Sequence, residues 1–259
     1  MTTWLYDGSF DGFLSAVFDL YWQKRTDVMI RKEQDHVRGL FGNVIFTPTV
    51  VANADRVWAG LSKKLPEESL QQLFCCYLSE LPGEEDNMVG FIRHVFASKQ
   101  DVTGDFSNKY VLHVSQIARK VLKEKHRMEA FVRFQLTRDN IYYSLVSPEY
   151  NVLPLIARHF KDRYADQYWL IYDEHRRFGI YYNLQHVETI RLHFNGEYDP
   201  YYHSTGNVWA PEEELYQRLW HTYFKEVNIP GRKNPRLQLQ HMPKRYWKYL
   251  TEMKGFTRQ

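Results

Sequence analysis

The chain has 259 residues, a formal net charge of +3 at pH 7, 44% hydrophobic residues and 25% charged residues. This length is enough for a large core in one or two domains, and the composition is that of an ordinary globular protein. No apolar run approaches membrane-spanning length and no secretory signal is recognisable, so we expect neither a membrane protein nor a secreted one. The two cysteines, Cys75 and Cys76, are adjacent, which is a poor arrangement for a structural disulfide. We therefore expect a cytoplasmic protein.

The first half of the chain is predicted to be mainly helical. Residues 3–6 and 44–47 are candidate strands, while residues 21–38 give a mixed polar signal. Ser9 can cap a helix, because apolar residues follow it at helical spacing: Phe10, Phe13, Leu14, Val17 and Phe18. Four more apolar stripes predict helices over 57–65, 70–81, 88–96 and 111–122.

The second half of the chain is predicted to contain a sheet. Two β-rich runs with a short polar break between them are typical of a hairpin, and they cover 128–136 and 141–146. A helix is predicted over 152–164, followed by strands over 168–172, 178–183 and 187–192. Only the connection that contains this helix is long enough for a parallel crossover, so the sheet should be mostly antiparallel.

The expected fold class is α+β in a single compact unit, 1–259. Its mainly helical half, 1–125, is expected to pack with an antiparallel sheet, helices and a basic C-terminal tail in 126–259. One late helix, beginning near Pro211, carries apolar residues on more than one face, so we expect it to be buried or to form a contact surface. These residues are Leu215, Tyr216, Leu219, Trp220, Tyr223, Phe224 and Val227.

Positive charge is concentrated at the end of the chain. Residues 231–259 contain eight Lys and Arg and one acid, a net charge of +7, so residues 1–230 carry −4. Clustered bases attract phosphates and exposed aromatic rings stack on unpaired bases, which predicts a nucleic-acid contact, DNA or RNA. The alternative is that the aromatic rings pack onto the body of the protein while the basic groups stay solvated. The candidate residues are Arg232, Lys233, Arg236, Lys244, Arg245, Tyr246, Trp247 and Lys248.

Several segments of the sequence resemble a known family. They are Tyr6-Asp7-Gly8-Ser9-Phe10-Asp11-Gly12, His126-Arg127-Met128-Glu129-Ala130-Phe131-Val132-Arg133-Phe134, Trp169-Leu170-Ile171-Tyr172-Asp173-Glu174, and Asn234-Pro235 with His241-Met242-Pro243-Lys244-Arg245-Tyr246-Trp247. The chain resembles the bacterial family of probable DNA metabolism proteins over nearly its whole length. The resemblance implies a domain of unknown function that is usually encoded beside a radical-SAM DNA repair protein. Related domains are sometimes fused to a uracil-DNA glycosylase-like module.

Further ligand-binding candidates lie outside the tail or at its edge. They are Asp7, Arg133, Arg176, Arg177 and His241. Each has a structural alternative: Asp7 is typical of a cap at a helix start, and Arg133 is typical of an ion pair across a sheet. The two arginines are typical of a charged hairpin turn, which could also touch phosphate.

A metal site is a weak alternative in the second half. Its candidate ligands are His186, His193 and His203, near Glu188 and Asp199. Eleven histidines in the chain make chance clustering common, so no metal and no cofactor is predicted.

The absence of several known motifs reduces the number of possible functions. Two adjacent cysteines cannot hold a radical-SAM cluster, which needs three, so the chain is at most the partner of such an enzyme. Phosphate-loop, nucleophile-elbow and zinc-protease motifs are absent from the sequence. Leu81-Pro82-Gly83 looks like the start of a DNA-gripping helix-hairpin-helix, but Glu84 and Glu85 put negative charge where a phosphate would approach, so that motif is rejected.

Three functions remain open. The leading hypothesis is an accessory protein of DNA metabolism or repair that binds nucleic acid, a radical-SAM partner, or both. The second is an enzyme that acts on nucleic acid or a nucleotide through His and Asp residues of the C-terminal half. The third is a purely protein-binding subunit, for which an apolar surface patch is the expected mark. Whether the protein is an enzyme stays open.

Overall fold

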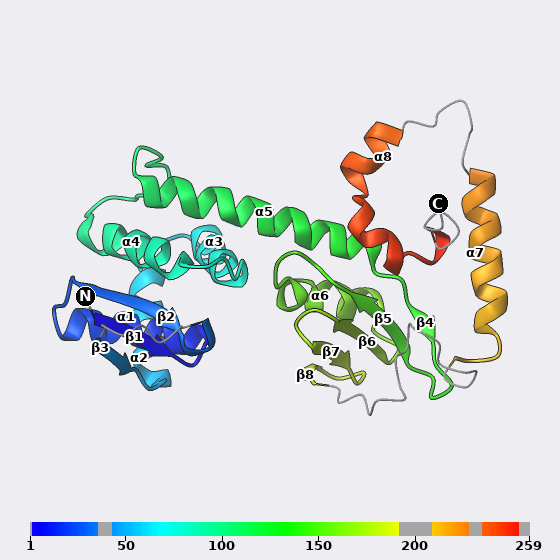
Figure 1. The fold of residues 1–259 in the computed structure, drawn as a ribbon, viewed down its shortest axis with the longest axis horizontal. Helices are drawn as coiled ribbons and strands as arrows, with labels where there is room; N and C mark the ends of the chain where they lie inside the picture. The colour runs from blue at the N-terminus through cyan, green and yellow to red at the C-terminus, as the bar shows by residue number, and fades with distance from the viewer. Residues whose placement is uncertain (1, 36–42, 192–208, 228–234, 254–259) are drawn as a thin grey trace. The chain divides into compact units, whose positions relative to one another are not determined.

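The computed structural model describes residues 2–35, 43–191, 209–227 and 235–253 (Figure 1). The chain forms two compact units, Met1–Leu122 and Lys123–Gln259. The helix α5 (Lys109–Phe131) contributes its first part to one unit and its last part to the other. The expectation that the two halves pack as a single unit stays a prediction.

The N-terminal unit contains a small parallel sheet. Its strands are β1 (Thr2–Tyr6), β2 (Val28–Lys32) and β3 (Asn43–Phe46), in the order β2-β1-β3. The central strand β1 is buried along its whole length, and α1 (Phe10–Trp22) forms the crossover to β2. The strands predicted at 3–6 and 44–47 are therefore confirmed. Strand β2 was not predicted, because its end is charged and only tertiary contacts stabilise it there: Arg31 pairs with Asp86, and Lys32 lies over the ring of Tyr77.

Helices make up the rest of the N-terminal unit, as predicted. They are α2 (Val51–Ser62), α3 (Glu67–Leu78), α4 (Glu84–Ala97) and the first part of α5, with a short 3₁₀ helix, η1 (Glu33–Asp35). The apolar stripes that predicted them face the core, with Leu61, Leu73 and Ile92 fully buried. Cys75 and Cys76 are buried on α3, and neither forms a disulfide.

The strand predicted over 128–136 is wrong. Helix α5 continues to Phe131, and only β4 (Gln135–Leu136) remains of the expected strand. The alternating pattern was misleading because Met128 and Val132 are four residues apart, so they also share one face of a helix, and both are buried. An ion pair between Lys125 and Glu129, at helical i, i+4 spacing, further supports the helix.

The C-terminal unit is built on a five-stranded, mostly antiparallel sheet, as predicted. Its order is β4-β5-β6-β7-β8, with β5 (Tyr142–Val146), β6 (Trp169–Asp173), β7 (Phe178–Tyr182) and β8 (Val187–Ile190). The one parallel pair, β5 with β6, is joined across α6 (Leu153–Arg163), the connection that the sequence marked as a possible crossover. The fold class is therefore α+β.

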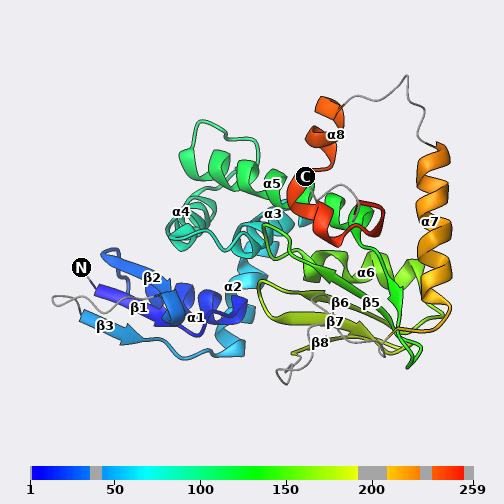
Figure 2. The same cartoon turned by 45° about the vertical axis from the view of Figure 1, so that its right-hand side comes forward.

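The last elements of the C-terminal unit are helical (Figure 2). They are α7 (Glu213–Val227), α8 (Pro235–His241) and two 3₁₀ helices, η3 (Lys244–Tyr249) and η4 (Thr251–Met253). Tyr249 packs into a core cluster with Tyr143, Leu145, Leu170 and Tyr172 of β5 and β6. Among the described residues, no helix combines the length and the apolar character needed to cross a membrane.

We predict that Gly90→Ala destabilises the protein, although alanine favours helices more than glycine does. Gly90 lies in α4, where a Cβ atom would overlap the ring of Tyr110. Overpacking of this kind costs about 1–3 kcal/mol in the free energy of unfolding. Urea unfolding measures the change. Gly104→Ala is the control, because nothing lies within 4 Å of a Cβ there, and an equal loss in both variants would contradict the packing argument.

Candidate nucleic-acid interface

The basic C-terminal segment is docked onto the C-terminal unit through its aromatic residues. Tyr246, Tyr249, Leu250 and Met253 are all buried. The ring of Tyr246 lies 5.4 Å from that of Phe131, and Tyr249 belongs to the core beside the sheet. Two of the three aromatic residues between 246 and 249 are therefore part of the core, which leaves Trp247 as the half-buried ring of this segment.

A buried carboxylate, Glu124 of α5, anchors the start of this segment. The hydroxyl of Tyr246 donates to Glu124 Oε2 at 2.5 Å, and Arg245 Nη2 donates to the same atom at 3.0 Å. The second oxygen, Oε1, accepts the backbone N–H of Glu149 at 2.8 Å, so one side chain joins α5, η3 and the loop after β5. Burial raises the pKa of Tyr246 above its ordinary value, and the hydrogen bond with Glu124 raises it further. The Tyr246 hydroxyl therefore stays protonated as the donor.

A second buried carboxylate, Glu252 of η4, anchors the end of the segment. Arg133 donates to it at 2.9 and 3.1 Å, and the indole Nε1 of Trp220 on α7 donates at 3.0 Å. The guanidinium of Arg133 also lies over the Trp220 ring, 5.6 Å from its centroid. Arg133 is thus placed in an ion pair with a carboxylate, although the partner is on a distant helix and not on the neighbouring strand that the sequence suggested.

The hairpin tip between β6 and β7 is held by a third buried carboxylate. Asp173 accepts the backbone N–H groups of His175 and Arg176 at 2.9 and 3.1 Å and the Arg176 guanidinium at 2.9 Å. Burial raises the pKa of Asp173, and this effect outweighs the opposing hydrogen bonds from Arg176. Arg176 also donates to the carbonyl oxygens of Pro148 and Glu149 at 3.0 and 3.1 Å. Arg176 is therefore a structural link between the hairpin and the loop after β5.

These contacts form a cleft of about 470 Å³ between three elements of the C-terminal unit. The loop after β5, the hairpin tip and η3 each contribute to its lining: Ser147, Pro148, Glu149, His175, Arg245, Lys248 and Tyr249. The hairpin contributes His175 to this lining and the tail contributes Arg245 and Lys248, so two candidate segments from the sequence meet at one place, with Arg176 bonded to the loop beside it. The sequence reasoning treated them separately because 54 or more residues lie between the arginines of the hairpin and the bases of the tail.

The cations around this cleft differ in how far they are neutralised. Lys248 pairs with Glu174 at 2.9 Å, and Arg245 pairs with Glu149 at 2.8 Å in addition to Glu124. Lys244, Arg177 and Arg236 are exposed. Within the described ranges none of these three has a carboxylate within ion-pair distance. The ammonium of Lys244 lies 6.0 Å from the centroid of the Trp247 ring, whose Nε1 donates to the carbonyl of Met242 at 3.0 Å.

The remaining sequence candidates lie elsewhere or outside the described residues. Asp7 is in the N-terminal unit, where it accepts hydrogen bonds from Ser9 and Thr49 at 2.7–2.9 Å. Partial burial acts to raise the pKa of Asp7, but these hydrogen bonds outweigh it, so the pKa is lowered. His241 is exposed at the end of α8. Arg232, Lys233, His193 and His203 lie outside the described residues.

The weak metal candidate His186 is exposed and pairs with Glu188 at 2.6 Å in the turn between β7 and β8. The described part of the chain contains no group of three or more His, Cys, Asp or Glu side chains that could hold a metal ion.

Sequence reasoning missed the carboxylates that organise this region. Glu124 had a detectable signal, because it lies on the same helical face as Ile117, Val121 and Met128, all of which are buried. A charged residue on an apolar helix face predicts a buried charge with partners. Glu149 and Glu174 had no such signal, since both lie in loops beside strands.

The fold and the cleft together define an α+β protein whose C-terminal unit has a cleft lined partly by basic residues of η3, the 3₁₀ helix that also carries the half-buried ring of Trp247. Residues 82–252 match the model of a domain of unknown function, DUF4130. The chain therefore belongs to the DUF4130 family. The match ends at Glu252, so it includes the docked segment and the whole described sheet of the C-terminal unit. No curated protein and no solved structure matches the chain.

We predict that Glu252→Gln lowers stability by about 2 kcal/mol near neutral pH, because hydrogen bonds to a charged partner contribute about this much. Although burial opposes it, the hydrogen bonds from Arg133 hold the pKa of Glu252 below its ordinary value. Such a group stabilises the fold above the unfolded pKa of about 4.3, and this contribution disappears as the pH falls through the folded pKa.

Urea unfolding of both proteins at several values between pH 7 and pH 3 measures this effect. The difference between wild type and Glu252→Gln should be constant above about pH 5 and shrink below it. Glu214→Gln, an exposed position on α7, is the matched control. A difference that stays constant down to pH 3 would contradict the assigned ion pair.

Proposed function

We propose that this protein is an accessory factor of DNA metabolism that binds nucleic acid at the cleft between η3 and the β6–β7 hairpin. The observation that carries the proposal is the convergence of two separate basic segments on one cleft. Lys244 and Arg177 carry charges that no carboxylate of the described chain neutralises, while Arg245 and Lys248 share theirs with acids. A negatively charged ligand in the cleft would therefore meet the ion-paired cations Arg245 and Lys248, while Lys244 and Arg177 are exposed on the same two segments.

The proposed contact combines phosphate binding with stacking. Lysine and arginine side chains at the rim neutralise backbone phosphates, which makes the affinity depend on salt. Trp247 offers a partly exposed ring on which an unpaired base can stack, whereas Tyr246 and Tyr249 are buried and cannot. The arrangement suits a single strand better than a duplex, because one ring beside a small cleft accommodates a splayed base and its flanking phosphates.

The biological setting rests on the resemblance to the probable DNA metabolism proteins. That resemblance implies a neighbouring radical-SAM DNA repair protein, while the cytoplasmic location is proposed from the adjacent cysteines and the absence of a recognisable secretory signal. The DUF4130 family itself is described only as a domain of unknown function. We propose that the nucleic-acid contact serves the repair reaction of the partner, since the cleft holds no recognisable catalytic group set of its own.

We predict that Lys244→Ala combined with Arg177→Ala weakens binding of labelled single-stranded DNA, measured by fluorescence anisotropy across salt concentrations. Each lost phosphate contact lowers the slope of log K against log salt by about 0.7 for a single strand. The slope of log K against log salt should therefore be less steep for the double variant than for the wild type, by about 1.4. Arg245 is left intact, because its removal would expose the buried Glu124 and confound binding with stability.

The matched control is Arg158→Ala with Arg163→Ala, which removes two exposed cations of α6 in the same unit. Its salt slope should equal that of the wild type. Trp247→Leu should weaken single-stranded DNA more than duplex DNA, since only unpaired bases stack. Absence of binding at low salt, or an equal loss in the control, would overturn the proposal.

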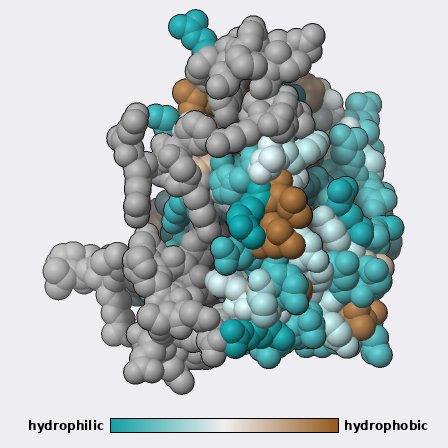
Figure 3. Space-filling view, turned by 90° about the vertical axis from the view of Figure 1, so that its right-hand side faces the viewer, coloured by the Kyte–Doolittle hydropathy of each residue, from teal (hydrophilic) through white to brown (hydrophobic). Residues whose placement is uncertain are grey.

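A second candidate function, a protein-binding subunit, is favoured by the exposed face of α7. Five large apolar or aromatic residues of this helix are between 37% and 58% exposed: Leu215, Tyr216, Leu219, Trp220 and Tyr223. The view from the side of α7 shows brown apolar side chains bordered by hydrophilic ones (Figure 3). An apolar stripe rimmed by polar residues is typical of a protein interaction site. We propose that it receives the radical-SAM partner.

We predict that Tyr216→Ser with Tyr223→Ser abolishes co-purification with the radical-SAM protein and leaves DNA anisotropy unchanged. Both side chains are more than half exposed, so the fold should not depend on them. Loss of aromatic anchors at an interface weakens binding strongly, by about 2 kcal/mol or more for a central one. Glu212→Gln with Glu214→Gln, exposed positions near the start of α7, controls for nonspecific surface effects. Unchanged co-purification would remove α7 as the interface.

A further inference from the structure

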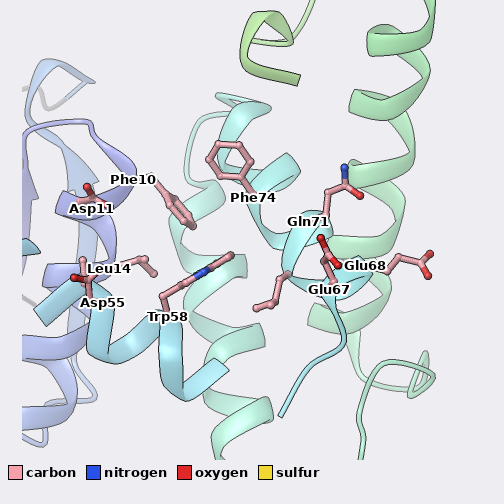
Figure 4. A pocket seen from close by; sticks show the side chains of 11 residues that line it. Phe10, Asp11, Leu14, Asp55, Trp58, Glu67, Glu68, Gln71 and Phe74 are labelled. Carbon is pink, nitrogen blue, oxygen red and sulfur yellow. The ribbon is translucent and has the colours of Figure 1, made fainter. Parts of the chain in front are cut away.

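The N-terminal unit contains a cavity of about 780 Å³ that neither proposed function uses. It lies between α1, α2 and α3, and Figure 4 shows the side chains around it. Its lining residues are Phe10, Asp11, Leu14, Ala54, Asp55, Trp58, Glu67, Glu68, Leu70, Gln71 and Phe74. A volume of this size falls within the range of about 300–1,000 Å³ that is typical of small-molecule sites.

Aromatic rings form the walls of the cavity. Phe10 packs edge-on against Trp58 and Phe74, with ring centroids 5.6 and 5.1 Å apart. All three rings are half-buried, so each has a part that faces the opening, while Leu14 and Ala54 form a buried floor. Because these contacts brace the rings against one another, the cavity keeps its shape without a ligand.

All the ionisable groups that line the cavity are acids. They are Asp11, Asp55, Glu67 and Glu68, each exposed. In the described ranges of the chain, none of the four lies within ion-pair distance of a Lys or Arg side chain. Asp11, Glu67 and Glu68 lie in first turns of helices, where acids are favoured by the helix dipole. Asp55 is in the middle of α2, where the helix dipole does not favour an acidic residue, and its side chain lines this cavity.

The acids are divided between two ends of the cavity. In Figure 4, Asp11 and Asp55 lie on one side and Glu67 and Glu68 on the other, with the rings of Phe10 and Trp58 between them. This arrangement places negative charge at both ends of an apolar, aromatic middle. A ligand that matches it carries positive charges at its ends and methylene groups between them.

We infer that this cavity binds a linear aliphatic polyamine. The terminal ammonium groups would pair with Asp11 and Asp55 at one end and with Glu67 at the other. The methylene chain would lie along Phe10 and Trp58, whose π faces also attract cations. An anionic ligand would be repelled by four carboxylates.

The inference is tested by isothermal titration calorimetry of the full-length protein, freed of nucleic acid, with spermidine as the probe. Asp55→Asn with Glu67→Gln removes one charge from each end without changing the size of either side chain. Both residues are exposed, so the variant should fold normally. Because each exposed ion pair contributes up to about 1 kcal/mol and two are removed, the double variant should bind spermidine measurably more weakly, by up to about 30-fold.

Two comparisons make the result specific to the cavity. Glu33→Gln with Asp35→Asn removes two exposed carboxylates of η1 in the same unit, and its affinity should equal that of the wild type. Butylamine, which has one charged end, should bind more weakly than 1,4-diaminobutane, which has two. No saturable binding of spermidine, an unchanged affinity in Asp55→Asn with Glu67→Gln, or an equal loss in the control variant would overturn the inference. A site that prefers a lysine-rich peptide to spermidine would also overturn it.

Discussion

The C-terminal unit depends on the buried carboxylate of Glu124. Its two oxygens accept the Tyr246 hydroxyl, the Arg245 guanidinium and the backbone N–H of Glu149, so one side chain fixes a helix, a 3₁₀ helix and a loop. A buried carboxylate that loses a partner costs several kcal/mol, which makes the three contacts mutually dependent. The cleft exists because the loop after β5 and η3 are held at one point.

Ion pairs with buried and surface carboxylates also determine which basic side chains are available to a ligand. In the docked tail, Arg245 pairs with Glu124 and Glu149, and Lys248 pairs with Glu174. A count of Lys and Arg in the tail therefore overstates its attraction for phosphate. The charge that remains for binding is set by residues such as Lys244 and Arg177, which are exposed and have no carboxylate within ion-pair distance in the described ranges.

The sequence predicted those features that depend on local periodicity. The helices of the N-terminal unit and the strands β5 to β8 follow from apolar spacing of 3.6 or 2. The failure at 128–136 shows the limit of this method, because an apolar residue at every second position also satisfies an i, i+4 pattern and only tertiary packing selects between them. The cleft could not be predicted, since it depends on Arg176 reaching the carbonyl groups of Pro148 and Glu149. Such a contact leaves no trace in residue spacing.

Charged side chains that have partners and those that lack them play different roles in this protein. Glu84 and Glu85, which follow Gly83 at the start of α4, are buried with His113 and Tyr6 as partners. They therefore place two buried acidic side chains at the start of the helix, in the turn that superficially looks like a phosphate-gripping motif. Within the described chain, the carboxylates around the Trp58 cavity and the ammonium of Lys244 beside Trp247 lack such charged partners. Leaving a charge unpaired beside an exposed aromatic ring gives the fold no stability, so these two places are where a ligand of opposite charge has most to contribute.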